Sequence, residues 1–183
     1  MPRYMEVLLK KRTVRCVARL LDEEAPKTCE AVWRALPLAG PVYHAKYASN
    51  EIYTLVPAFA EVEPGRENRT LVPTAGDILY FYLPSGTKVP PESRKLDAGG
   101  RGIIDLAVFY DRNNLLFSPS EGPTPGNHFA IIIKNREEMR QAGHDVWREG
   151  FVGESLIYRR LEGEALMEWG LGDEYRSHPK APS

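Results

Sequence analysis

Residues 14–53 contain, in order, an alternating strand, an acidic turn, a short helix, a Pro/Gly turn and a second strand. In residues 14–20 (VRCVARL) small and apolar side chains alternate with arginines, which is typical of a half-buried strand. Pro26 suits the first turn of a helix, where its missing N–H costs nothing. The apolar residues that follow recur at the spacing of one helical face: Cys29, Val32, Trp33 and Leu36.

The rest of the chain indicates a mostly β protein. The segment 77–83 (DILYFYL) is apolar on both faces, so we expect a barrel strand covered on both sides. Residues 136–142 predict a second short helix that ends at Gly143. Other strand-like segments are residues 4–9, 41–48, 51–56, 103–110, 127–134, 146–152 and 155–161. Many strands, two short helices and long Pro/Gly loops predict a closed antiparallel β-barrel with two capping helices.

Length and composition are those of one globular domain. The 183 residues predict a single domain with a core at about 4–162 and a polar tail from about residue 175. The formal net charge of −1 gives no reason to expect nucleic acid or an anionic membrane as a partner. No apolar run approaches the roughly 20 residues that span a bilayer. The N-terminus does not resemble a signal peptide, so we expect a cytoplasmic protein.

The ordered set of motifs resembles the cyclophilin family. The strand–helix–strand order of residues 14–53, with Tyr43-His44 on its last strand, is similar to the opening of a cyclophilin, where that strand carries a Phe-His-Arg triplet. Residues 126–131 (GNHFAI) and 143–147 (GHDVW) resemble later cyclophilin segments, and residues 154–161 match the final strand loosely. The resemblance implies a cyclophilin-like barrel with a ligand groove.

The same resemblance argues against prolyl isomerase activity. The position of the isomerase arginine, which donates a hydrogen bond to the twisted amide, is occupied by Ala45. Residues 50–53 (NEIY) replace the family's Phe-Met-x-Gln motif, and His128 replaces its glutamine. Only His144 keeps its residue type. The chain is more similar to a group of uncharacterised bacterial and archaeal cyclophilin-like proteins, through its "HAK…NEIY" and "GN-FA" segments.

Five residues form the predicted ligand-binding pocket. A hairpin would bring His44 close to Glu51 or Tyr53 across the strand pair, and the resemblance places His128 beside the same groove. The full candidate set is His44, Glu51, Tyr53, Tyr80 and His128. The functional interpretation is an aromatic-walled site with a few orienting polar groups. The alternative is that these residues pack one end of the barrel.

Other chemistries find less support in the sequence. A metal site would use His44, Glu51 and His128, but closely spaced ligands such as His-x-His do not occur, so we expect no metal and no cofactor. No Gly-x-Ser-x-Gly elbow is present, and residues 99–102 (GGRG) lack the Lys-Ser/Thr of a phosphate loop. Basic residues are interleaved with acids, which disfavours single-strand nucleic-acid binding.

Three functional hypotheses remain open. The first is a protein that binds a small molecule or short peptide in the altered groove. The second is an enzyme with His44 or His128 as general base and Glu51 orienting it. The third is a structural role with self-association as a homo-oligomer through aromatic strand edges and residues 84–102, a segment that could also be a lid or disordered.

Overall fold

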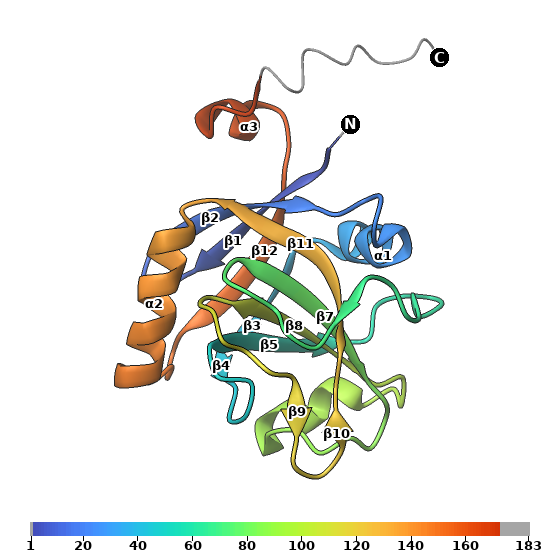
Figure 1. Ribbon diagram of the computed structural model, residues 1–183. Helices are drawn as coiled ribbons and strands as arrows, with labels where there is room; N and C mark the ends of the chain where they lie inside the picture. The colour runs from blue at the N-terminus through green and yellow to red at the C-terminus, as the bar shows by residue number, and fades with distance from the viewer. Residues whose placement is uncertain (1, 173–183) are drawn as a thin grey trace.

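The computed structural model describes residues 2–172, so the predicted polar tail lies outside the described residues. The chain forms a large antiparallel sheet with helices on either side of it (Figure 1). The strands are β1 (Tyr4–Leu9), β2 (Val14–Leu20), β3 (Leu38–Pro41), β4 (Tyr43–His44), β5 (Glu51–Pro57), β6 (Arg69–Thr70), β7 (Asp77–Leu83), β8 (Ile103–Phe109), β9 (Phe117–Ser118), β10 (Gly122–Pro123), β11 (Gly126–Lys134) and β12 (Ser155–Leu161). The helices are α1 (Pro26–Ala35), the 3-10 helix η1 (Pro91–Asp97), α2 (Arg136–Glu149) and α3 (Glu164–Glu168).

Ten strands pair into one antiparallel sheet, as the alternating sequence pattern predicts. Their order is β3-β12-β1-β2-β11-β7-β8-β5-β4, with β6 also paired to β11, while β9 and β10 form a separate small hairpin. Within residues 2–172 no hydrogen-bonded ladder joins the two ends of this sheet. The end strand β3 nevertheless approaches β5 closely, because a Cβ atom on Gly40 would lie 2.4 Å from Thr54 Oγ1.

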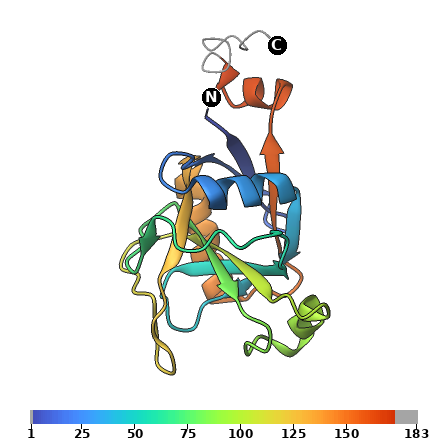
Figure 2. The same cartoon turned by 90° about the vertical axis from the view of Figure 1, so that its right-hand side faces the viewer.

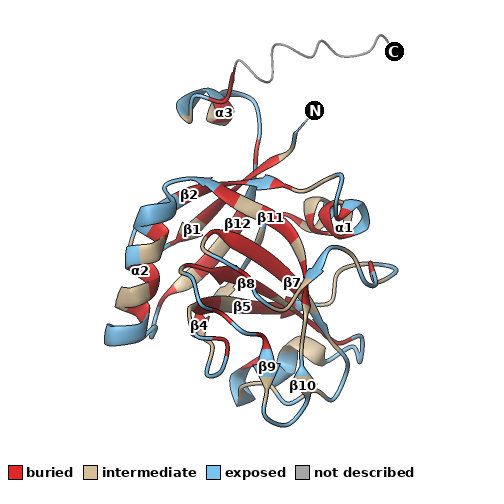
Figure 3. Cartoon of the chain, in the orientation of Figure 1, coloured by how far each residue is buried: buried red, intermediate tan, exposed pale blue. Residues whose placement is uncertain are grey.

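A single large apolar core fills the space inside the curved sheet. Inward-facing residues of the strands, such as Ile52, Ile78 and Val108, are fully buried in it. Helix α1 lies across the sheet in Figure 2, and α2 lies on the opposite side of the strands in Figure 1. Both helices bury one face against this core, through Val32 of α1 and Met139 of α2, and expose the other face (Figure 3).

Both cysteines are buried free thiols. The Cys16 thiol lies 3.1 Å from the carbonyl oxygen of Asn135, and the Cys29 thiol lies 3.2 Å from that of Phe129. Burial raises the pKa of each thiol to about 12. Neither thiol therefore ionises at neutral pH, in agreement with a packing role.

The N-terminus of α1 is capped by a residue distant in the sequence. The Glu67 carboxylate accepts hydrogen bonds from the backbone N–H groups of Lys27 and Thr28 and from the Thr28 hydroxyl. It thereby satisfies N–H groups that have no partner within the helix. No acidic residue lies in the first turn of the helix itself, so this carboxylate comes from outside the helix.

Helix α2 is twice as long as predicted. It continues through Gly143 to Glu149, so the strand predicted at residues 146–152 is wrong. Gly143 is required for a close contact rather than for a helix end, because a Cβ atom there would lie 2.2 Å from Cγ of the Tyr110 ring. The buried positions Met139 and Val146 continue one apolar stripe across the glycine.

Two other segments differ from expectation. Residues 45–48 leave the strand predicted at 41–48 and form a loop between β4 and β5. The segment 84–102 contains helix η1, and Leu96 of this helix packs onto the sheet together with Val89, which precedes it. No helix in the described range is long and apolar enough to cross a membrane.

Candidate ligand-binding pocket

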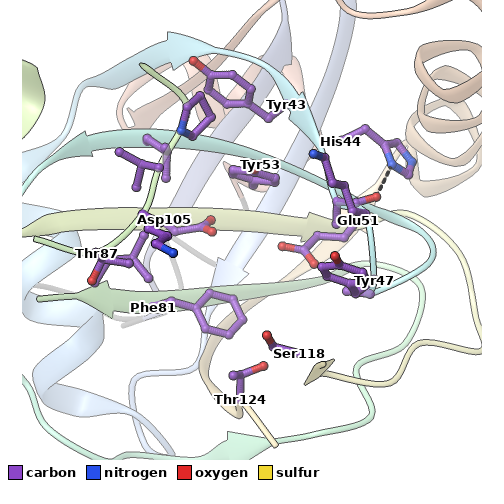
Figure 4. Close-up of a pocket in the computed structure, with 18 of the residues that line it drawn as sticks. Tyr43, His44, Tyr47, Glu51, Tyr53, Phe81, Thr87, Asp105, Ser118 and Thr124 are labelled. Carbon is purple, nitrogen blue, oxygen red and sulfur yellow. Dashed lines mark hydrogen bonds between the residues drawn. The ribbon is translucent and has the colours of Figure 1, made fainter. Parts of the chain in front are cut away.

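The main pocket lies on the outer face of β5, β7 and β8, opposite the core. Its volume is about 740 Å³. The floor is formed by alternate residues of the strands, and loops 45–48, 84–92 and 116–124 form the walls (Figure 4). A volume of this size falls in the range of sites for small organic molecules.

Two small apolar clusters hold the loops around this pocket. One cluster packs Ala48 and Leu116 against Ala107 and Phe109 of β8. The other packs Val89 and Leu96 against the sheet. Because Tyr53 contacts both clusters, it lies at the centre of the outer face of the sheet.

Glu51 is the first polar residue of the floor. Its side chain points into the pocket (Figure 4), and the residue is only 6% exposed. Its carboxyl group makes no hydrogen bond or ion pair with any residue that the structure describes. Burial raises the pKa of Glu51 to about 8, so the group holds its proton at neutral pH.

Asp105, a partly buried residue, supplies the second carboxyl group of the floor. Its Oδ1 atom is inaccessible to solvent and has no hydrogen-bond partner among residues 2–172. Burial, and to a lesser degree the charge of Glu51, hold the pKa of Asp105 well above its usual range. A buried carboxyl group without a partner is costly in a fold, so such a group is a candidate for a functional site.

Tyr53 completes the polar set. The β4–β5 ladder pairs it with Tyr43, and the two rings stack with centroids 5.4 Å apart. The Tyr43 hydroxyl is held by Ser93 and Glu92, whereas the Tyr53 hydroxyl has no partner in the described part of the chain. Burial raises the pKa of Tyr53, and the nearby acids Asp105 and Glu51 raise it further. The pocket therefore presents two carboxyl groups and one phenol without partners.

His44 borders the pocket, but its ring turns away from it (Figure 4). Its Nδ1 lies 2.9 Å from the carbonyl oxygen of Ala45, which can only accept, so Nδ1 carries the proton. Its Nε2 lies 2.8 Å from the Tyr110 hydroxyl and accepts a hydrogen bond from it. Burial lowers the pKa of His44, which keeps the ring neutral. The direct His44–Glu51 contact needed by the acid–base hypothesis is therefore not formed.

The other two predicted pocket residues lie elsewhere. Tyr80 is on the core-facing side of β7, where its hydroxyl donates to Glu63 and its ring packs against Phe59. His128 Nε2 lies 3.3 Å from a carboxylate oxygen of Asp77. Neither residue lines the pocket, so the structure brings together His44, Glu51 and Tyr53 but not the remaining pair.

The sequence interpretation missed Asp105 and Phe81. Both lie on the outer face of the sheet, where strand alternation places Phe81 rather than Tyr80. The available signal was the segment 103–109 (IIDLAVF), where one acid interrupts a strand that is apolar on both faces. Because both faces of such a strand are covered, an acid in it is shielded from solvent on either face.

The structure offers little to a metal ion. Within residues 2–172 no group of three or more His, Cys, Asp or Glu side chains is arranged to hold one. Another histidine–carboxylate pair, His144 of α2 with Asp111 of the segment after β8 at 2.8 Å, also lies outside the pocket lining.

The fold and pocket define a mostly β protein with a loop-walled pocket on one sheet face. The chain belongs to the family DUF3830, described as a protein of unknown function, whose model matches residues 7–158. No curated protein matches the chain.

The solved structures that are similar to it include these two. One is McbB in complex with tryptophan, at 18% identity and a TM-score of 0.59, covering 87% of this chain and 45% of McbB. The chain thus spans just under half the length of McbB. The other is the solution structure of the hypothetical protein AF2241 from Archaeoglobus fulgidus, at 18% identity and a TM-score of 0.43, covering 87% of this chain and 95% of AF2241.

Proposed function

We propose that this protein binds a small molecule, or one side chain of a short peptide, in the pocket over β5, β7 and β8. The observation that carries the proposal is the convergence of Glu51, Tyr53 and Asp105, none of which has a side-chain hydrogen-bond partner in the described chain, in one pocket of about 740 Å³. Buried polar groups are normally satisfied. A bound ligand would satisfy these three.

The lining around the polar groups also suits a ligand. Leu55, Phe81 and Leu83 supply apolar floor, and Phe117 and Phe151 add aromatic edges. Pockets with mostly apolar walls and a few convergent polar groups are the usual form of small-molecule sites. McbB, which has a similar fold, is solved with tryptophan bound; the proposal for this chain depends on its own pocket residues.

Fragment screening by NMR tests this proposal. Binding is expected to shift the backbone amide signals of residues 51–55 and 103–107, and Glu51→Gln or Asp105→Asn is expected to change the affinity. Glu24→Gln, at an exposed acid remote from the pocket lining, is the matched control and should leave the affinity unchanged. If no fragment of a diverse library shifts the pocket amides, the proposal is wrong.

A second candidate is an enzyme that uses Glu51 as a general acid or base. A carboxyl group with a pKa of about 8 is protonated at neutral pH and can donate a proton to a bound substrate. In this candidate Glu51 acts without His44, because His44 Nε2 is already hydrogen-bonded to the Tyr110 hydroxyl. If a turnover is found, Glu51→Gln should abolish it while ligand binding persists; unchanged turnover in that variant would exclude this role.

We further propose that the sheet is a closed cyclophilin-like barrel in a cytoplasmic protein that self-associates. The close approach of Gly40 on β3 to Thr54 on β5 supports closure. Exposed apolar side chains at Tyr47 and Trp147, 63% and 66% accessible, support self-association. Sedimentation at high concentration tests the second point: a monomer throughout would contradict it.

A further inference from the structure

We propose that the ligand of this pocket is a positively charged organic amine, with its ammonium group between Glu51 and Asp105 and its apolar body against the aromatic walls. This inference depends on the proposed binding function and adds the chemical class of the ligand. It is argued from the charges, the aromatic rings and the geometry of the pocket.

The first argument is the charge of the pocket. Its lining includes four acidic residues (Glu51, Glu92, Asp105 and Glu121) and two lysines (Lys46 and Lys88). Both lysines are exposed at the rim, and neither forms an ion pair with Glu51 or Asp105. Glu51 and Asp105 therefore have no counter-charge in the described chain. A ligand that brings a positive charge would stabilise the ionised form of these acids and pair with it, whereas an anion would oppose their ionisation.

The second argument is the position of the aromatic side chains. Tyr53 lies between the two carboxyl groups in the ladder and stacks on Tyr43, while Phe81 borders the same space from β7 (Figure 4). The faces of aromatic rings attract organic cations, and the attraction increases where water is excluded. The rings also supply apolar area for the body of the ligand.

The third argument concerns hydrogen bonds. A primary ammonium has three N–H donors. The pocket offers three acceptors without partners in the described chain: the carboxyl groups of Glu51 and Asp105 and the phenol of Tyr53. A bare metal ion fits less well, because no cluster of three metal-binding side chains is found in residues 2–172.

Three probes that share one phenyl body test the charge preference. They are 2-phenylethylamine, 2-phenylethanol and 3-phenylpropionate, measured with the full chain by NMR shift titration at pH 7. The amine is expected to bind about tenfold or more tightly than the alcohol, and the acid most weakly. Glu51→Gln and Asp105→Asn should each reduce the amine affinity about tenfold and leave the alcohol affinity nearly unchanged. Glu24→Gln controls for the replacement of a carboxyl group by an amide outside the pocket.

Two results would overturn the inference in distinguishable ways. If the alcohol or the acid binds in the pocket as tightly as the amine, the cation preference is wrong and the binding function stands. If the amine does not bind but neutral or acidic fragments of the screening library do, the cation preference is again wrong and the binding function again stands. If neither the probes nor any library fragment shifts the pocket amides, both the inference and the proposed function are wrong.

Discussion

Glu51 and Asp105 face the same pocket from two hydrogen-bonded strands, with Tyr53 between them. The ladder pairs Leu55 with Asp105 and Tyr53 with Ala107, so the two acids are separated along one face of the sheet by the tyrosine. In the described chain neither carboxyl group has a hydrogen-bond partner. This relationship determines the electrostatics of the pocket and predicts how stability depends on pH.

Glu51→Gln should change the pH dependence of stability between pH 5 and 8. Folding raises the pKa of Glu51 from 4.5 to about 8, so in this window the folded protein binds more protons than the unfolded chain. Stability therefore falls as pH rises, by up to about 1.4 kcal/mol per pH unit from this one group, and the full cost is reached above pH 8. Urea unfolding at pH 5.5 and 8 should show a smaller fall in the variant. Equal falls in variant and wild type would refute this assignment.

Glu67→Ala should destabilise the protein by about 1–2 kcal/mol. The substitution removes the acceptor for two N–H groups of α1 and for the Thr28 hydroxyl, which is fully buried. Urea unfolding at pH 7 measures the change. Glu61→Ala, at an exposed acid in the same loop, is the control and should lie within about 0.5 kcal/mol of wild type. A similar effect of both substitutions would argue against the cap.

Gly143→Ala should destabilise the protein by about 1–3 kcal/mol, although alanine is the better helix former. The added Cβ would meet the Tyr110 ring at 2.2 Å and displace α2 or the ring. Because the Tyr110 hydroxyl donates to His44, the signals of the His44 ring should also shift in the NMR spectrum. Gly99→Ala is the matched control, since a Cβ there has no atom within 4 Å. A stabilised Gly143→Ala variant would contradict the packing described.

Strand alternation made most of the sheet predictable from the sequence. The segments 4–9, 77–83 and 155–161 match β1, β7 and β12, because one or both faces of each carry regular apolar residues. The second half of α2 was not predictable in the same way. Gly143 resembles a helix stop, and only the position of the Tyr110 ring, set by the tertiary fold, explains a glycine inside the helix.

The pocket was only partly predictable for a related reason. The sequence placed Glu51 and Tyr53 on one face of a strand, and the structure places both in the pocket floor. The sequence could not establish which face of β7 lines the pocket, so the prediction named Tyr80 in place of Phe81. His128 came from the family resemblance, and in this chain its Nε2 lies 3.3 Å from Asp77 and outside the pocket lining.

The central claim is that Glu51 and Asp105 are acids without partners in the described chain, that Glu51 holds its proton in the ligand-free pocket at neutral pH, and that burial raises the pKa of Asp105 well above its usual range. A side-chain carboxyl ¹³C NMR titration of the ligand-free protein measures this directly, with Glu51→Gln and Asp105→Asn to assign the signals. The account predicts that Glu51 titrates with a pKa near 8 and that Asp105 titrates well above its usual range. Two carboxyl groups that titrate near 4 would contradict the account, because the acids would then be hydrated or paired.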